Sequence, residues 1–190
     1  MLVRPSEPEA LLDEDAFAED EFMPYWAELW PAGLALAEAL PTDLDGARVV
    51  ELGCGLSVPS LVAAARGAQV TAVDWAADAI ELLRENATRN ALTVEAVNAD
   101  WRSFDGEFDL ALAADVLYEA RNIEPLVHLL PRLAPEALVA LAGRPYEAEF
   151  LHLVVAEPWR RLRCHMEAMP ALPAWPFAPA DRIVCIRAPA

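Results

Sequence analysis

The sequence predicts an α/β domain with a mostly parallel sheet and helices on both of its faces. Short apolar runs alternate with segments of helical periodicity along most of the chain. The apolar runs are continuous, which is typical of strands that are buried on both faces. Several of the runs end in an acidic residue or a glycine turn. Regular alternation of this kind indicates parallel strands connected by crossover helices.

The expected elements follow one another with short turns between them. An aromatic cluster at residues 25–31 precedes the first expected helix. Helices are expected at 31–40, 60–66, 76–90, 121–133 and about 146–156. Strands are expected at 49–52, 70–73, 94–97, 108–113 and 137–142, followed by strand-like runs at 161–166 and 183–186. Pro131 falls late in the 121–133 helix, where a proline opposes its continuation.

The domain organisation is simple. Residues 1–24 form an acidic leader with a weakly amphipathic pattern, expected to be a short helix or arm lying against the domain. Residues 25–190 show no break in composition and no repeat, so one domain is expected there.

The charge balance limits the function classes. All 14 cationic side chains are arginines, against 31 acidic ones, and the net charge is −17. Such a field repels nucleic acid, whose phosphates require clustered cations. It favours a basic partner or a cationic ligand, or it serves solubility alone. Disorder is excluded because 56% of the residues are hydrophobic.

The three cysteines are odd in number and have no close spacing, so neither a disulfide framework nor a metal site is expected. No run approaches the roughly 18 apolar residues of a membrane span. The acidic N-terminus does not resemble a signal peptide. We therefore expect a reduced, cytoplasmic protein without a membrane partner.

Polar residues at the ends of the first two strands suggest a ligand site. After Glu51, the glycines Gly53 and Gly55 permit a sharp turn and close approach of a ligand. Val58 takes the place of the third glycine of a dinucleotide fingerprint, which argues against a nicotinamide cofactor. Asp74 ends the next strand, where a carboxylate can accept two hydrogen bonds from a ribose diol. The bland alternative is a plain turn followed by a solvated aspartate.

The next two strand ends add further candidates. Asp100 and Trp101 could bind an adenine amine and pack on its ring, or serve as a helix cap and a core residue. Asp115 and Tyr118 could hold a cationic amine by charge and cation–π contact, or act as a cap and a packed aromatic. Arg144, after the fifth strand, borders this mouth or lies on the surface.

Together these motifs, E-x-G-x-G, a following acidic residue, D-W and D-x-x-Y, resemble the class I S-adenosylmethionine-dependent methyltransferases. The chain is most similar to the seven-strand lysine methyltransferase group known as methyltransferase family 16. Trp30 before an apolar helix matches that group's pre-core tryptophan, and Asn86 and Asn90 match its paired asparagines. The resemblance covers about residues 22–145.

The resemblance implies a Rossmann-like, doubly wound, seven-stranded sheet whose last strand is antiparallel. It implies S-adenosylmethionine as cofactor, with Asp115 and Tyr118 facing the substrate and Glu51 opposite the cofactor's ammonium group. Ser57 stands where a glycine is common and is expected to cap the following helix. The implied cofactor-binding residues are Trp30, Glu51, Gly53, Cys54, Gly55, Asp74, Trp75, Asp100, Trp101 and Ala114.

The implied activity is methyl transfer to a basic or amine-bearing acceptor, possibly a protein, with a lysine side chain as the first hypothesis. The acceptor could instead be a small molecule or another protein atom, because one fold serves many chemistries. A third hypothesis is a module that binds S-adenosylmethionine or a partner without catalysis.

Overall fold

A computed structural model describes residues 1–7, 11, 24–156, 163–168 and 182–187. Its sheet has the order β3-β2-β1-β4-β5-β7-β6. Five of these strands run parallel, and each lies within two residues of its predicted position, which confirms the predicted α/β class. They are β1 (Arg48–Leu52), β2 (Gln69–Asp74), β3 (Val94–Asn98), β4 (Leu110–Ala114) and β5 (Glu136–Leu141).

The far edge of the sheet is formed by the end of the chain. There β7 (Arg182–Arg187) pairs in antiparallel register with both β5 and β6 (Arg163–Ala168). These two strands coincide with the strand-like runs expected near the C-terminus. The predicted arm at residues 1–24 lies largely outside the described residues.

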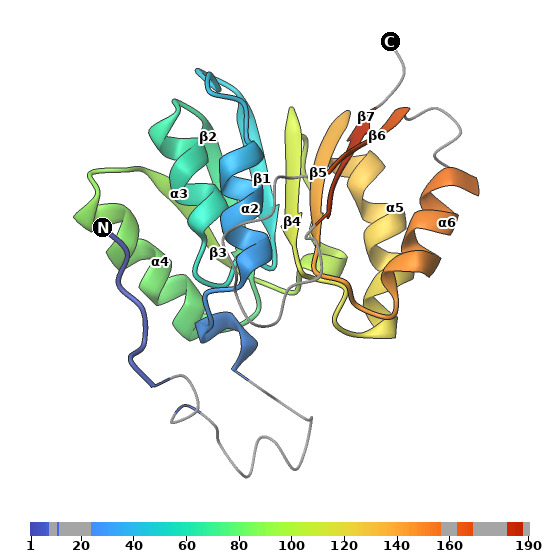
Figure 1. Cartoon of the computed structure of the whole chain (residues 1–190). Coiled ribbons are helices and arrows are strands. Elements are labelled where there is room, and N and C mark those ends of the chain that lie inside the picture. Colours follow the sequence, from blue (N-terminus) through green and yellow to red (C-terminus); the bar gives the residue numbers. More distant parts are fainter. Residues whose placement is uncertain (8–10, 12–23, 157–162, 169–181, 188–190) are drawn as a thin grey trace.

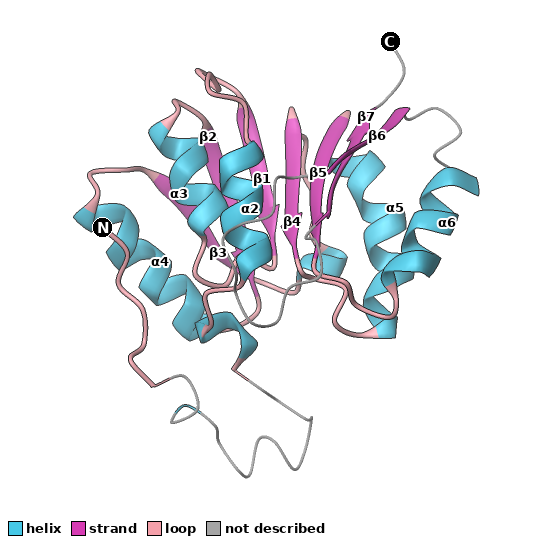
Figure 2. Cartoon of the chain, viewed as in Figure 1, coloured by secondary structure: helices cyan, strands magenta, loops and turns pink. Residues whose placement is uncertain are grey.

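Helices cover both faces of the sheet (Figures 1 and 2). One face is covered by α2 (Pro31–Ala39), α3 (Val58–Ala65) and α4 (Ala77–Arg89), and the other by α5 (Ile123–Leu133) and α6 (Glu147–Ala156). Side chains of a strand point alternately to the two faces. In β4, Leu112 therefore packs in the cluster with α2 and α3, and Ala111 and Ala113 pack in the cluster with α5.

The order of the strands places the ligand site. The chain builds β1, β2 and β3 in one direction and then returns to place β4 on the other side of β1. Connections after β1 and β4 therefore leave in opposite directions, and a crevice opens beyond the carboxyl ends of these strands.

α5 continues through Pro131 to Leu133, because Leu130 and Leu133 are buried in the core and this packing outweighs the lost main-chain hydrogen bond.

Near the N-terminus, the main chain of Val3 makes two hydrogen bonds with the side chain of Asn86, at 2.7 and 2.9 Å. The first residues of the chain thus lie against α4.

No helix within the described ranges has both the length and the apolar character needed to cross a membrane.

The core packing predicts a large difference between two leucines. Leu112 is fully buried between the sheet and its helices, whereas Leu34 on α2 is 40% exposed. Leu112→Ala should lower the free energy of unfolding by about 2–5 kcal/mol, because it leaves a cavity. Leu34→Ala should change it by only about 0.5 kcal/mol. Urea denaturation of the two variants measures both values, and similar losses would contradict this account of the core.

Candidate active site

The loop after β1 has a main chain that only small residues accommodate. Gly53 and Gly55 have φ angles of +63° and +47°. A Cβ atom at Gly53 would lie 3.0 Å from the Val116 side chain, and one at Gly55 would lie 3.2 Å from the Trp26 carbonyl oxygen. The two glycines therefore let the loop turn sharply and let Val116 and Trp26 pack closely against it.

Glu51, at the end of β1, caps α3. Its Oε2 accepts the Ser60 N–H at 2.9 Å and also accepts a hydrogen bond from the Ser60 hydroxyl. Ser57 occupies the N-cap position with a left-handed φ of 57°, but its hydroxyl donates to the Gly55 carbonyl at 3.2 Å. The expected Ser57 cap is therefore wrong, because the buried carboxyl group already takes the helix N–H.

Burial controls the protonation of Glu51, which is only 1% exposed. Loss of hydration raises the pKa of this carboxyl group to about 8, although the hydrogen bonds from Ser60 oppose the shift. Glu51 is thus mostly protonated at neutral pH. Burial also raises the pKa of the neighbouring Cys54 thiol well above its usual value, and the nearby Asp74 and Glu51 add to this shift.

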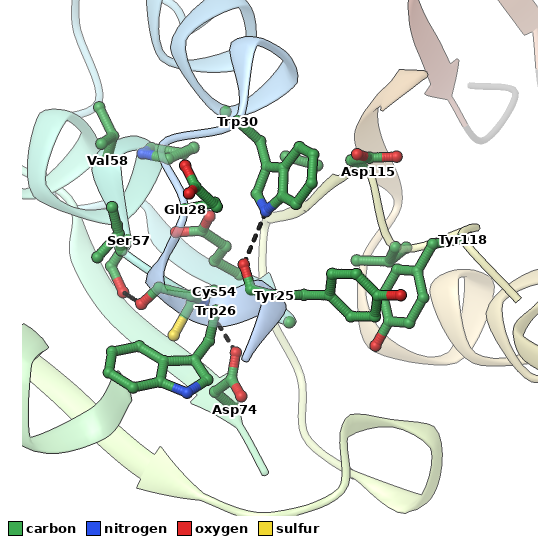
Figure 3. A pocket seen from close by; sticks show the side chains of 18 of the residues that line it. Tyr25, Trp26, Glu28, Trp30, Cys54, Ser57, Val58, Asp74, Asp115 and Tyr118 are labelled. Atoms are coloured by element: carbon green, nitrogen blue, oxygen red, sulfur yellow. Dashed lines mark hydrogen bonds between the residues drawn. The ribbon is translucent and has the colours of Figure 1, made fainter. Parts of the chain in front are cut away.

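Asp74 connects the end of β2 to the loop after β1 that contains Gly53 and Gly55, called the glycine loop from here on. Its Oδ2 accepts the Gly55 N–H at 2.8 Å (Figure 3). Its Oδ1 accepts the Ala76 N–H at 2.9 Å. Burial raises the pKa of Asp74, and these hydrogen bonds limit the rise. Since each oxygen retains a further lone pair, the carboxylate can still accept hydrogen bonds from a ligand.

Residues from distant parts of the sequence line one pocket beyond the ends of β1, β2 and β4. Of the predicted site residues, those that line it are Trp30, Glu51, Gly53, Cys54, Gly55, Asp74, Trp75, Trp101, Ala114, Asp115 and Tyr118. Trp75 is half exposed at its rim, whereas Trp101 is 5% exposed.

Asp100 is the predicted residue that the structure does not bring to this pocket. Its two oxygens bind the Arg102 guanidinium group at 2.8–3.1 Å, and Oδ1 also accepts the Arg102 N–H. The adjacent guanidinium holds the pKa of Asp100 below its usual value. The carboxylate therefore caps the short helix η3 (Trp101–Ser103), as the bland alternative for this residue predicted.

The far end of the pocket contains a partly buried ion pair, in which Asp115 is buried and the Arg144 side chain is 34% exposed. Asp115 follows β4 with a left-handed φ of 52°, and its side chain is only 4% exposed. Arg144 donates from Nε to Asp115 Oδ1 at 2.9 Å and from Nη2 to Oδ2 at 2.6 Å. The Arg144 guanidinium carbon also lies 5.3 Å from the Trp30 ring centre.

Aromatic side chains form a wall beside Asp115 (Figure 3). The Tyr25 ring lies 5.1 Å from the Tyr118 ring and 6.3 Å from the Trp30 ring, centre to centre. Trp30 Nε1–H donates to the Tyr25 carbonyl at 2.7 Å. Burial raises the pKa of Tyr118 to about 12, so its phenol stays protonated at neutral pH.

Sequence analysis missed several residues of this pocket. Tyr25 comes from η2 (Tyr25–Ala27), and Trp26 and Glu28 follow it in the pocket lining. The aromatic cluster before α2 is visible in the sequence, but it did not indicate that these residues line the pocket. Arg144, which the sequence placed either at the mouth of the site or on the surface, follows the end of β5 and lines the pocket.

Within the described ranges, no group of three or more His, Cys, Asp or Glu side chains lies close enough to hold a metal ion.

Comparison with known proteins agrees with this geometry. Residues 49–134 match the methyltransferase domain family. The protein N-lysine methyltransferase METTL21A of Mus musculus is 35% identical over 146 residues, which is 69% of this chain and 66% of the relative. The electron transfer flavoprotein beta subunit lysine methyltransferase of Xenopus laevis is 34% identical over 135 residues, 67% of this chain and 54% of the relative. The chain spans about half the length of the curated relatives it matches.

Solved structures show the same fold. Magnesium protoporphyrin IX methyltransferase from Synechocystis PCC 6803, solved with S-adenosylmethionine bound, has a TM-score of 0.66 and 15% identity, covering 94% of this chain and 99% of that one. The fold and the domain match define a class I methyltransferase domain. Within this class, the chain resembles methyltransferase family 16.

S-adenosylmethionine is the cofactor of this domain class, and the residues present fit it. The main chain of the glycine loop lines the pocket at Gly53 and Gly55, and Glu51 and Asp74 line the same pocket. Trp75 and Trp101 supply flat apolar surface for an adenine ring.

Glu51 should make stability depend on pH. Between its ordinary pKa of 4.5 and the value of about 8, the folded protein keeps a proton that the unfolded chain has lost. The contribution of Glu51 to the unfolding free energy therefore falls as pH rises through this range, by up to about 1.4 kcal/mol per pH unit. The advantage of wild type over Glu51→Gln should shrink by a few kcal/mol between pH 5 and pH 7.5, in urea denaturation. Glu38→Gln, an exposed substitution on α2, is the control, and a pH-independent difference for Glu51→Gln would contradict the assignment.

Asp74 should matter for cofactor affinity. Asp74→Ala removes a buried charged acceptor and leaves the Gly55 N–H without its partner. We expect S-adenosylmethionine to bind about 10- to 100-fold more weakly, since hydrogen bonds to charged groups contribute about 1.5–3 kcal/mol. Isothermal calorimetry measures the change. Asp78→Ala, at an exposed position in the first turn of α4, should bind as wild type does, and equal affinities for both variants would refute the role of Asp74.

Proposed function

We propose that this protein is an S-adenosylmethionine-dependent methyltransferase that methylates a lysine side chain of another protein. The observation that carries the proposal is a single pocket with two different ends. One end has the glycine loop and Asp74, and the other has Asp115 beside an aromatic wall (Figure 3). Several relatives at 32–35% identity are named protein-lysine methyltransferases, which supports lysine as the acceptor.

The task of the protein follows from the chemistry. When bound, S-adenosylmethionine supplies a methyl group on a positively charged sulfur, which is already a strong electrophile. The side chains must therefore bind the acceptor amine in line with the methyl group and exclude water. Trp30, Tyr25 and Tyr118 provide an apolar wall suited to a lysine side chain. Asp115 can accept an N–H of the amine through a free lone pair.

Of the described residues at this end, neither Tyr118 nor Asp115 is suited to remove a proton. The Tyr118 phenol stays protonated because its pKa is about 12. The Asp115 carboxylate is already bound by a guanidinium group. We therefore propose that the proton of the acceptor amine leaves to water.

A second candidate is methyl transfer to another protein atom or to a small molecule. The cypemycin N-terminal methyltransferase of Streptomyces sp is 35% identical over 106 residues, which is 54% of this chain and 42% of the relative. An N-terminal amine and a lysine amine require similar chemistry, so this relative favours an amine acceptor without selecting which one. Binding without catalysis is the third candidate.

The proposal extends to location and architecture. A cytoplasmic location is supported by three cysteines without close spacing. A basic partner is supported by the net charge of −17. A seven-stranded sheet with an antiparallel last strand, within a single domain at residues 25–190, is supported by the pairing of β7 with β5 and β6.

The first experiment separates the candidates. The protein is incubated with methyl-labelled S-adenosylmethionine and a dialysed cell lysate, and label is counted in protein and small-molecule fractions. Because the chain has no lysine, labelled methyl-lysine in an acid hydrolysate cannot come from self-modification. Labelled methyl-lysine is the expected result. Label in small molecules alone would move the assignment to the second candidate, and binding without transfer would favour the third.

Asp115→Ala should separate catalysis from cofactor binding. Transfer should fall about 100-fold or more, because the variant loses the group that orients the amine. S-adenosylmethionine affinity should stay within a few-fold of wild type, as measured by calorimetry. Asp105→Ala, whose side chain is 80% exposed, is the control and should leave both quantities unchanged. Normal transfer by Asp115→Ala would exclude this role.

A further inference from the structure

The carboxylate expected to bind the acceptor already binds a cation of the protein itself. Both oxygens of Asp115 accept from the Arg144 guanidinium group, at 2.9 and 2.6 Å. A lysine ammonium is a single point charge and cannot reproduce two parallel N–H donors. Since the Asp115 side chain is only 4% exposed, separation of the pair would leave a buried charge without its full compensation.

Arg144 is held from three directions. Its guanidinium lies over the Trp30 ring at 5.3 Å, a cation–π arrangement. Its main-chain N–H donates to Glu147 Oε1 at 2.9 Å, and Glu147 is itself buried. Gly143, with φ of +83°, turns the chain from the end of β5 toward the pocket. These contacts make Arg144 a fixed part of the pocket wall.

We infer that Asp115 and Arg144 remain paired during turnover and act as one positioning unit that binds the acceptor lysine as its neutral amine. Asp115 accepts an N–H of the amine, while Arg144 cancels the charge that would otherwise favour the ammonium form. This inference rests on the proposed function. It assigns Arg144 as a specificity-determining residue for the protonation state of the acceptor.

The charge matters because only the neutral amine can react. The nitrogen lone pair forms the new N–C bond, the sulfur keeps the electron pair of the broken S–C bond, and the nitrogen loses one proton to water. An ammonium nitrogen has no lone pair. A lone carboxylate would raise the pKa of the amine, whereas a carboxylate paired with a guanidinium carries no net charge and does so far less.

Other titratable groups face the same space and set the background for the pH dependence. Glu51 and Tyr118 stay protonated at neutral pH, as their raised pKa values require. The groups that line the pocket or contact Arg144 are Tyr25 and Glu28 before α2, Glu51 on β1, Cys54 in the glycine loop, Asp74 on β2, Asp115 and Tyr118 after β4, and Glu147 on α6. Among the described residues that line the pocket, Arg144 is the only cation, and Arg102 and Arg121 act on Tyr118 from outside the lining.

The test compares two substitutions at Arg144. Lysine methylation of the lysate protein fraction labelled by wild type is followed from pH 6.5 to 10. For Arg144→Gln, the midpoint of the pH–rate profile should rise by about one to three units, the effect of a nearby unpaired charge. The rate at pH 7.5 should fall about tenfold or more, and most of it should return at high pH. For Arg144→Lys, the midpoint should stay at the wild-type value, because the charge is kept, with a lower rate at every pH.

Two controls separate this role from a structural one. Arg132→Gln, on α5 and paired with exposed Asp105, makes the same charge change outside the pocket lining and should leave the profile unchanged. S-adenosylmethionine affinity, measured by calorimetry, should equal that of wild type in all three variants. If Arg144→Gln fails to fold, the midpoint of the pH–rate profile of Arg144→Lys serves as the test. A midpoint that differs from the wild-type value overturns the inference.

An unshifted midpoint for Arg144→Gln would overturn the inference. Faster transfer by this variant at pH 7.5 would also overturn it, and would show that the acceptor displaces Arg144 from Asp115. A wild-type protein that labels no lysine would refute the proposed function, and this inference with it. Lysine labelling with an unshifted Arg144→Gln midpoint would refute the inference alone.

Discussion

The Asp74 carboxylate is the point on which the geometry of the pocket depends, because it joins two loops that leave neighbouring strands. It accepts the Gly55 N–H from the loop after β1 and the Ala76 N–H from the turn after β2. Glu51 adds a second buried attachment by capping α3 through Ser60. Two carboxyl groups therefore fix the glycine loop at Gly55 and the first turn of α3 at Ser60, while the Ser57 hydroxyl donates to the Gly55 carbonyl within the loop.

The charge inside the pocket differs from the charge of the whole chain. The net charge is −17, yet burial keeps Glu51 mostly protonated at neutral pH and Arg144 compensates Asp115. These two carboxyl groups therefore add little negative charge to the pocket, whose lining also includes the acidic residues Glu28 and Asp74. The overall field can attract a basic partner over a distance, while the local balance at the acceptor end favours a neutral amine. These are separate effects, since one acts through solvent and the other within contact distance.

The sequence predicted the fold and much of the site because both depend on patterns that lie close together in the chain. Each parallel strand was predicted to within two residues of its observed position, and polar residues after the strands marked the carboxyl ends of the sheet. Asp100, one of the predicted cofactor-binding residues, is bound by Arg102, two residues away, and does not line the pocket. The helix predicted to run to residue 133 does so despite Pro131, because Leu130 and Leu133 pack in the core.

The sequence alone determined the alternation of strands and helices, the glycine loop and the acidic ends of the strands, since these follow from residue type and short spacing. Only the tertiary structure decided which of these groups meet. Asp115 and Arg144 are 29 residues apart, and they pair because β4 and β5 are neighbours whose ends lie side by side. Tyr25, which precedes α2, likewise contacts Tyr118 only because the fold brings these two distant segments together. The protonation of Glu51 was equally a tertiary property, because its pKa depends on how completely the packed helices remove water from β1.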